Sequence, residues 1–188
     1  MTTTEIIKKR RAIYPAMYTN ESIPDHVIQE VLELAAFAPT HRMTQPWKFK
    51  VFTGEGLKSL SSFLANYYKE NTAAEKYSDR KYNKTLNKPL KSTHVVAIIM
   101  KRDPEESVPE WEEIAAVSMA VQNIWLALTE REIGCYWSSP KSITNDTEFL
   151  RLGPGERCLG LLYIGRPSVH PEMPPREDMK TRIEWIVS

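Results

Sequence analysis

Residues 38–53 read APTHRMTQPWKFKVFT and separate a helical pattern from a strand pattern. The helical pattern ends at Ala38, because Pro39 disfavours a helical conformation in the residue before it. From Trp47 onward apolar and polar side chains alternate, which is typical of a half-buried strand. The polar residues between them form a loop bracketed by prolines, and loops held between ordered elements often carry binding or catalytic residues. The alternative is an ordinary helix-to-strand connection.

Length and composition indicate a globular chain. Its 188 residues predict one domain over 1–188, with a core that needs no disulfide or metal. Hydrophobic content of 41% and charged content of 26% are ordinary for a soluble protein, and a formal net charge of +1 disfavours general electrostatic binding of nucleic acid. The N-terminus lacks a signal-peptide core, and no apolar run approaches a membrane span. We therefore expect a cytoplasmic protein without nucleic-acid or membrane partners.

The two cysteines, Cys135 and Cys158, fall in apolar segments. Neither belongs to a CxxC motif, and no Cys/His cluster has the spacing of a zinc site. The sequence therefore predicts two buried, reduced thiols and no metal site.

Hydrophobic periodicity predicts the main elements. Helical spacing predicts helices over 24–38, 57–67 and 111–133, the last capped by Gly134, with short helices near 2–11 and 146–152. Alternating or continuous apolar runs predict strands over 47–53, 95–100, 135–139 and 158–164, with a further edge strand at 182–187. Four or five strands with helices between and around them define an α+β fold.

Two segments differ in character from the rest of the chain. Within 69–93, the stretch 69–91 carries seven Lys or Arg against three acids, which predicts a solvated surface excursion. The alternative is a lid that brings positive charge over a phosphorylated or acidic ligand. Residues 168–188 are rich in proline and charge, and they predict a tail that wraps over a surface.

Several polar and flat side chains are candidates for a binding site. Motifs of the GxSxG, HExxH, Walker A and GxGxxG types are absent. Arginines bind phosphate in a bidentate manner, although an arginine pair at a helix end also suits the helix dipole without a ligand. The candidates are Arg10, Arg11, Arg166, His41, Thr44, Gln45, Ser138, Ser139, Trp47 and Trp137. Phosphate-binding arginines, hydrogen-bonding groups and an apolar platform are what a flavin mononucleotide (FMN) site requires.

Taken in order along the chain, several motifs resemble the nitroreductase family. These are the pair Arg10-Arg11 ending the first helix, the APT and QPW sequences that bracket the loop, and GRP at 165–167. The resemblance spans nearly the whole chain. His41 in the loop, and Trp137 with a serine two positions later, resemble a compact bacterial subgroup of that family.

The resemblance implies a homodimeric FMN-dependent oxidoreductase with a mixed, mostly antiparallel sheet flanked by helices. Arg10, Arg11, Arg166 and the Ala12 backbone would hold the phosphate. His41 and Gln45 would approach the flavin from the same or the partner subunit, and Trp137, Ser138 and Ser139 would lie along the isoalloxazine. NADH or NADPH would reduce the flavin, and a nitroaromatic, quinone or enone would then accept two electrons in a ping-pong cycle. No side chain need act as acid or base, so no catalytic residue is assigned.

The sequence also departs from the family pattern. Ala12 and Tyr14 stand where the first motif usually has Ser and Arg. In the loop, larger members have Ser and Asn where this chain has His41 and Met43, and Ser138 stands where the subgroup has Arg. These changes leave two alternatives open. One is another flavin reaction on the same fold, such as desaturation or reductive removal of a substituent. The other is a flavin-binding module without enzymatic activity.

Overall fold

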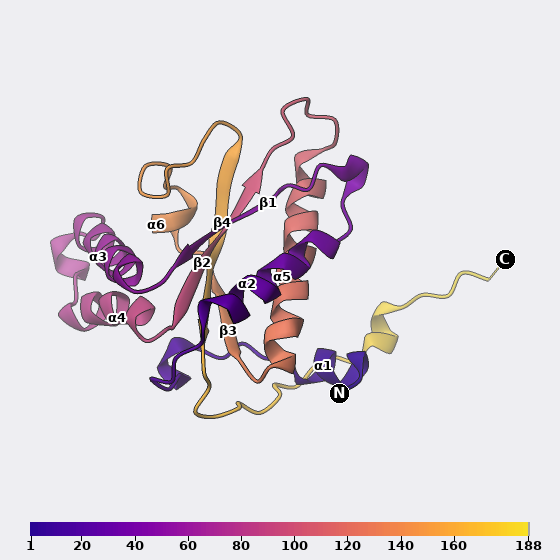
Figure 1. The fold of residues 1–188 in the computed structure, drawn as a ribbon, viewed down its shortest axis with the longest axis horizontal. Helices are drawn as coiled ribbons and strands as arrows, with labels where there is room; N and C mark the ends of the chain where they lie inside the picture. Colours follow the sequence, from indigo (N-terminus) through magenta and orange to yellow (C-terminus); the bar gives the residue numbers. More distant parts are fainter. Residues whose placement is uncertain (188) are drawn as a thin grey trace.

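A four-stranded antiparallel sheet forms the centre of the computed structural model, which describes residues 1–187 (Figure 1). The strands are β1 (Trp47–Phe52), β2 (His94–Lys101), β3 (Gly134–Ser138) and β4 (Glu156–Gly165). Their order is β1-β2-β4-β3, and all three pairings are antiparallel. The expected α+β fold, with an antiparallel sheet flanked by helices, is confirmed.

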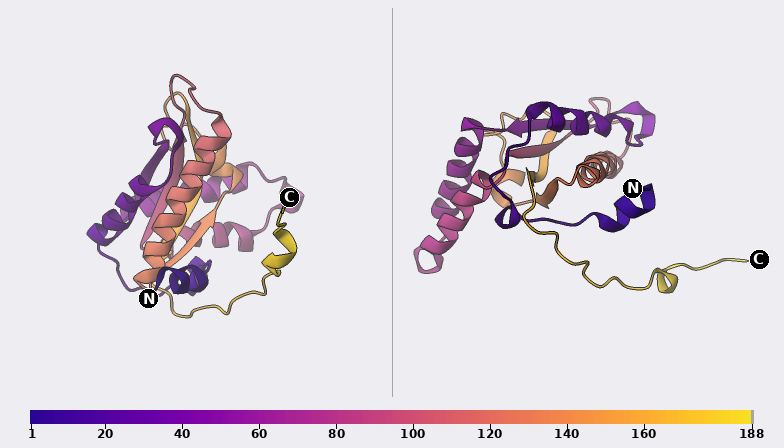
Figure 2. Two further views of the ribbon diagram at one scale, coloured as in Figure 1. Left: turned by 90° about the vertical axis from the view of Figure 1, so that its right-hand side faces the viewer. Right: turned by 60° about the horizontal axis from the view of Figure 1, so that its bottom comes forward.

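Helices flank the sheet and connect its strands. The α-helices are α1 (Thr3–Lys9), α2 (Asp25–Glu33), α3 (Glu55–Glu70), α4 (Asp79–Leu90), α5 (Glu110–Glu130) and α6 (Lys141–Thr144). Short 3-10 turns are η1 (Pro15–Met17), η2 (Leu34–Phe37), η3 (His41–Met43), η4 (Ala74–Lys76) and η5 (Met179–Arg182). Figure 2 shows α5 running alongside the sheet and the C-terminal segment extending away from the body. No helix in the described part of the chain is long and apolar enough to cross a membrane.

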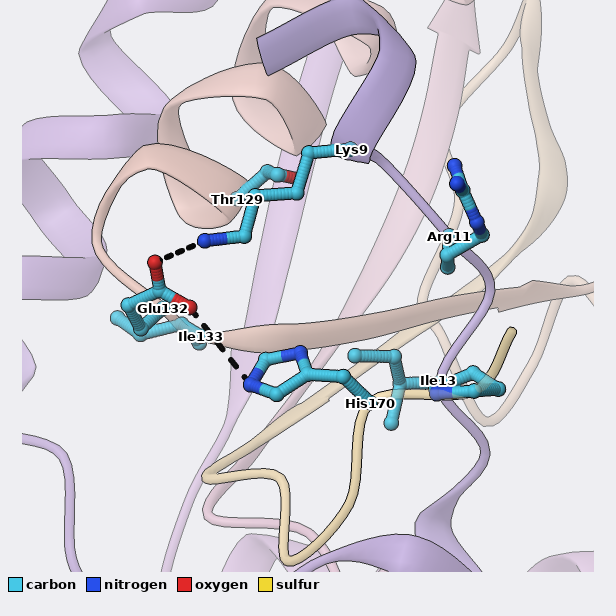
Figure 3. A pocket seen from close by; sticks show the side chains of 8 residues that line it. Lys9, Arg11, Ile13, Thr129, Glu132, Ile133 and His170 are labelled. Carbon is cyan, nitrogen blue, oxygen red and sulfur yellow. Dashed lines mark hydrogen bonds and ion pairs between the residues drawn. The ribbon is translucent and has the colours of Figure 1, made fainter. Parts of the chain in front are cut away.

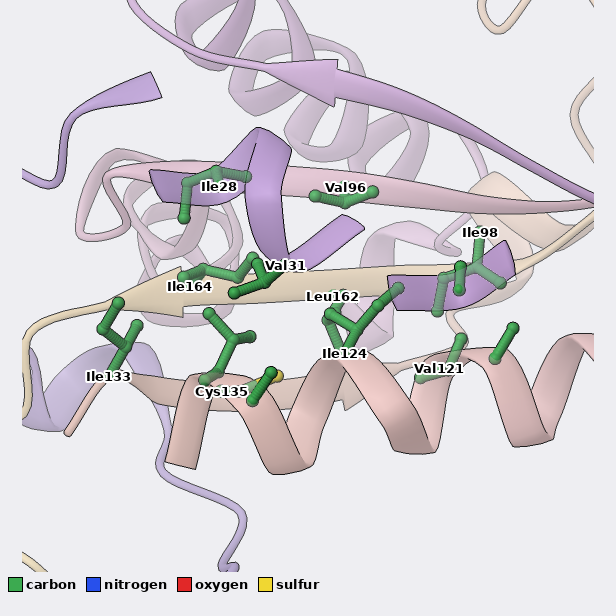
Figure 4. Close-up of a cluster of buried hydrophobic side chains, with 14 of the residues drawn as sticks. Ile28, Val31, Val96, Ile98, Val121, Ile124, Ile133, Cys135, Leu162 and Ile164 are labelled. Carbon is green, nitrogen blue, oxygen red and sulfur yellow. The ribbon is translucent and has the colours of Figure 1, made fainter. Parts of the chain in front are cut away.

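The sheet is buried on both faces, which explains the unbroken apolar run of β2. Val96 and Ile98 join a cluster with α2 and α5, and Figure 4 shows Ile124 of α5 in that cluster. Val95 and Ala97 point the other way, into a cluster that includes α3. Both cysteines are buried free thiols, as expected.

Several element boundaries differ from the expectation. α5 ends at Glu130, and Glu132 rather than Gly134 takes the left-handed conformation, with φ of 56°. Gly134 instead begins β3, where a Cβ atom would lie 2.8 Å from the Tyr18 ring. Close packing, not helix capping, therefore requires this glycine.

The helix expected at 146–152 is absent, and α6 forms earlier in the chain. The Asp146 carboxylate accepts hydrogen bonds from the amides of Phe149 and Leu150, which favours a turn over a helix. The edge strand expected at 182–187 is also absent from the described chain, because the residues after Arg182 are extended and unpaired.

The basic segment is helical. After η4 the chain forms α4, which packs against α3 to give a helical hairpin. The Tyr68 and Tyr77 rings stack with centroids 5.7 Å apart, and the Ser61 hydroxyl donates to the carbonyl of Leu86. The sequence is compatible with a helix-loop excursion here but did not predict the bounds of α4, because few of its residues are aliphatic. Tertiary contacts, rather than an apolar stripe, hold it in place.

Candidate functional site

Two adjacent arginines lie at the C-terminal end of α1, against α5. The Arg10 guanidinium stacks over the indole of Trp125 at 4.7 Å. The Trp125 indole N–H donates to the carbonyl of Arg11 at 3.2 Å, so α5 fixes the backbone here. Ala12 follows half-buried, and the amide of Ile13 donates to the carbonyl of Cys135 on β3 at 3.0 Å.

A third arginine, Arg176 of the C-terminal tail, comes close enough to influence Arg10. Burial lowers the pKa of Arg10, and repulsion from Arg176 and then Arg11 lowers it further. Arg11 keeps a buried Nε without a hydrogen-bond partner in the described chain. Positive charge gathered around Arg10, together with an unused buried donor on Arg11, fits a bound anion. The sequence analysis did not single out Arg176, because nothing local indicates where the tail runs.

We call Arg10 and Arg11 at the end of α1 the arginine corner. A small cavity of about 150 Å³ lies beside it, and the residues lining this cavity show how the tail is held (Figure 3). The ammonium of Lys9 pairs with one carboxylate oxygen of Glu132, and the other oxygen lies 3.6 Å from Nε2 of His170. Glu132 thus links the end of α1 to the first part of the tail. Farther along the tail, the positive charge of Arg176 lies near enough to Arg10 to lower its pKa.

Arg166 makes different contacts. Its Nη1 donates to the carbonyl of Arg131 at 3.3 Å, and its Nε lies 3.5 Å from a carboxylate oxygen of Glu21. The Arg166 side chain therefore contacts the turn after α5 and the segment before α2. Its assignment to the phosphate stays a prediction.

The loop that carries His41 and Gln45 lies at the N-terminal end of α5. His41 Nδ1 is 2.6 Å from a carboxylate oxygen of Glu112, in the first turn of that helix. Arg42, Met43 and Gln45 have φ values of 50°, 56° and 45°, which non-glycine residues rarely adopt. Such backbone strain persists only where surrounding contacts impose it, and it occurs often at functional sites.

The arginine corner and the loop are far apart within one chain. Glu112 contacts the loop and Trp125 contacts the arginines, and a helix rise of about 1.5 Å per residue separates them by about 20 Å. The candidates Arg10 and Arg11, which are neighbours in the sequence, lie beside Trp125 near the C-terminal end of α5. His41 and Gln45 are brought to the opposite end of α5.

The β3 candidates divide between the two faces of the sheet. Trp137 packs against the α5-side core, and its indole N–H donates to the carbonyl of Leu159 at 3.2 Å. Ser138 points to the other face, where its hydroxyl accepts a hydrogen bond from the ammonium of Lys88 at 3.2 Å. Ser139 is exposed beyond the end of the strand.

Lys88 is a further candidate residue, which the sequence analysis did not single out. Its ammonium lies 4.6 Å from the ring centroid of Tyr136 and 4.4 Å from that of Tyr163. Burial, with a smaller contribution from Lys84, lowers its pKa to about 8. It lines a cleft of about 750 Å³ between α4, η1 and β3.

Comparison with known proteins agrees with this architecture. The model of the nitroreductase family matches residues 7–166, and the chain belongs to that family. The Bacillus subtilis (strain 168) protein YfhC, named a putative NAD(P)H nitroreductase, is 28% identical over 182 residues, or 95% of this chain and 91% of YfhC.

Solved structures show the same fold. A nitroreductase-like family protein from Bacillus cereus superposes with a TM-score of 0.82 at 26% identity, covering 99% of this chain and 96% of that one. A Desulfovibrio desulfuricans protein in complex with FMN has a TM-score of 0.73 at 20% identity, covering 98% of this chain and 97% of that one.

Proposed function

We propose that this protein is an FMN-dependent oxidoreductase that uses NADH or NADPH to reduce electron-poor acceptors such as nitroaromatics and quinones. The observation that carries the proposal is the arginine pair at the end of α1, where Arg10 stacks on Trp125 and Arg11 keeps a buried Nε without a partner in the described chain. Arg176 of the tail adds positive charge that lowers the pKa of Arg10. A phosphate there would relieve the repulsion among the guanidinium groups and accept a hydrogen bond from the unpartnered Nε of Arg11. Family membership and the FMN-bound structure of similar fold support FMN as the source of that phosphate.

The path of residues 10–14 supports a cofactor lying along β3. The segment starts at the arginine corner, pairs with Cys135 through Ile13, and reaches the α4 cleft at Tyr14. From Cys135 to Ser138 the strand spans about 10 Å, since each residue rises about 3.3 Å. We assign the phosphate to the arginine end, and the flavin ring to Ser138, Ser139 and Lys88.

FMN, when bound, would supply the transfer of two electrons from a nicotinamide nucleotide to a second substrate. The side chains of this protein would hold and orient the cofactor. Lys88 would present a positive charge, and Ser138 a hydroxyl, to the polar edge of the ring. Reducing a nitro group to a nitroso group takes two electrons and two protons and releases one water. A hydride equivalent from NADH or NADPH supplies both electrons and one proton, and solvent supplies the second proton.

The separation along α5 favours a homodimer with the site between subunits. In one chain, His41 and Gln45 lie about 20 Å along α5 from the arginine corner. A second copy packed along α5 would bring the partner subunit's His41 and the partner subunit's Gln45 to the flavin. Exposed apolar side chains suit such packing, with Phe37 80% and Trp111 68% exposed.

The absorbance spectrum of the purified protein tests the proposal. We expect bound flavin absorbance that NADH or NADPH bleaches under anaerobic conditions and an acceptor restores. Protein that stays colourless after incubation with FMN refutes cofactor binding. Flavin that nicotinamide nucleotides reduce only slowly in stopped-flow experiments indicates a different flavin reaction. Bound flavin without turnover of any acceptor indicates a binding module.

Substitution in the tail tests the phosphate site. Arg176→Gln removes one charge-assisted contact, worth about 1.5–3 kcal/mol, and should weaken FMN affinity roughly tenfold or more. Arg182→Gln is the matched control, because Arg182 lies in the same tail and pairs with Glu177. Equal FMN affinities of both variants, measured by quenching of flavin fluorescence, would contradict the assignment of Arg176.

A further inference from the structure

One face of α4 carries a stripe of positive charge. Arg80, Lys84, Lys88 and Lys91 follow one another at three- or four-residue steps, so they share one side of the helix. All four line the cleft of about 750 Å³. The cleft also borders β3, the strand along which we place the flavin, because Lys88 contacts Ser138 of that strand. Asn83 and Asn87 complete the α4 wall, and none of the residues lining this cleft in the described chain is acidic.

The opposite wall is aromatic and apolar. The Tyr14 and Tyr136 rings meet with centroids 4.5 Å apart, and Pro15, Ala16 and Met17 of η1 continue the surface. A flat ring packs well against such a wall. The cleft thus combines an apolar platform with a row of cations.

Arg80, Lys84 and Lys91 are exposed, but solvation alone does not explain Lys88. Lys81, on the same helix, turns to another side and lies 4.8 Å from the centroid of the Tyr68 ring. Lys88 points inward between two tyrosine rings and bonds only to a neutral hydroxyl. A partly buried ammonium without a carboxylate is costly, and such groups occur often at functional sites. Lys84 is the charged group that adds to the pKa depression of Lys88.

We propose that this cleft is the acceptor site and that it selects aromatic acceptors carrying a carboxylate or another anionic substituent. The inference rests on the proposed oxidoreductase function and adds the substrate class. The aromatic ring lies on the wall formed by Tyr14 and Tyr136, and the anionic group faces Arg80 and Lys84 at the open end. Lys88 lies deeper, next to Ser138.

Paired acceptors test the proposal in steady-state kinetics with the FMN-loaded enzyme. The probes are 4-nitrobenzoate and the neutral 4-nitrobenzamide. The double variant Arg80→Gln/Lys84→Gln should lower kcat/KM for nitrobenzoate about tenfold and leave the value for nitrobenzamide within about twofold. Lys81→Gln is the control, because it removes one positive charge from the same helix outside the cleft, against two removed by the double variant. It should change neither value.

A binding measurement separates this proposal from the proposed function. Benzoate and benzamide are titrated calorimetrically into the purified protein without reductant. Preferential benzoate binding that the double variant loses supports the cleft, even if the protein shows no flavin-dependent turnover. Colourless protein overturns the oxidoreductase function separately.

Three outcomes overturn the anionic acceptor site. One is equal affinity for benzoate and benzamide. Another is an equal effect of the double variant and Lys81→Gln. The third is a change confined to KM for NADPH, which would assign the cations to the phosphate of the nucleotide.

Discussion

Replacing Gly160 by alanine should disturb the candidate site through the backbone. Gly160 lies in β4 beside a bulge, where Ile98 pairs with Gly160 and Ile99 pairs with Cys158, which leaves one extra residue on β4. Its φ of 140° is a conformation that side chains strongly disfavour. A Cβ atom would also lie 2.4 Å from Nε1 of Trp137 and 2.6 Å from the carbonyl oxygen of Ser138.

The loss of folding stability expected for Gly160→Ala follows from these two effects. Backbone strain costs about 1–3 kcal/mol, and overpacking costs a further 1–3 kcal/mol or so. The sum is roughly 2–6 kcal/mol, against a total stability of about 5–15 kcal/mol for a typical domain. In a chain of this size each 1 kcal/mol shifts Tm by about 2–4 °C. Gly160→Ala should therefore lower Tm by roughly 4–24 °C.

Thermal unfolding followed by far-ultraviolet circular dichroism measures the shift, and Gly56→Ala is the control. A Cβ at Gly56, in the first turn of α3, would meet only the Phe52 side chain, at an ordinary 3.6 Å. That change should leave stability unchanged or raise it by about 0.5–1 kcal/mol. Flavin content of purified Gly160→Ala should also fall, since Trp137 and Ser138 must move. A Gly160→Ala protein that melts at the wild-type temperature would refute the reasoning.

Four further predictions concern charge and assembly. As pH rises through about 8, Lys88 loses its proton and with it the positive charge beside the proposed flavin ring, so kcat/KM should fall for 4-nitrobenzoate and 4-nitrobenzamide alike. A step that persists in Lys88→Met would exclude this cause. Because the unfolded chain keeps that proton up to the ordinary value of 10.5, Lys88 should also make stability rise between pH about 8 and 10.5 in urea titrations. Glu132→Gln should release the tail from Lys9 and His170 and speed its proteolysis, whereas Glu130→Gln should not. Equal proteolysis rates of the two variants would contradict the role of Glu132 in holding the tail. Phe37→Glu should give monomers in light scattering, and an intact dimer would remove Phe37 from the interface.

The sequence by itself determined the sheet and the main helices. β2 and β4 are apolar runs, β1 alternates, and α2 and α5 carry apolar stripes; each pattern is local and follows from which faces are buried. Pro39 and Pro46 likewise bracket the loop in the structure as they do in the sequence. The family motifs lie on these same segments, so the family was recognisable before the fold was known.

Tertiary structure decided which of these residues meet. The charge of Arg176 acts on Arg10 because the tail runs near the end of α1, and Lys88 reaches Ser138 because α4 folds back on α3. The helix expected at 146–152 gave way to turns fixed by Asp146. The length of α5 keeps His41 away from the arginines of its own chain. Hydrophobic periodicity in the sequence indicates which side of a helix or strand is buried. Contacts between residues far apart in the sequence depend on how whole elements pack, and the candidate binding site consists of such contacts.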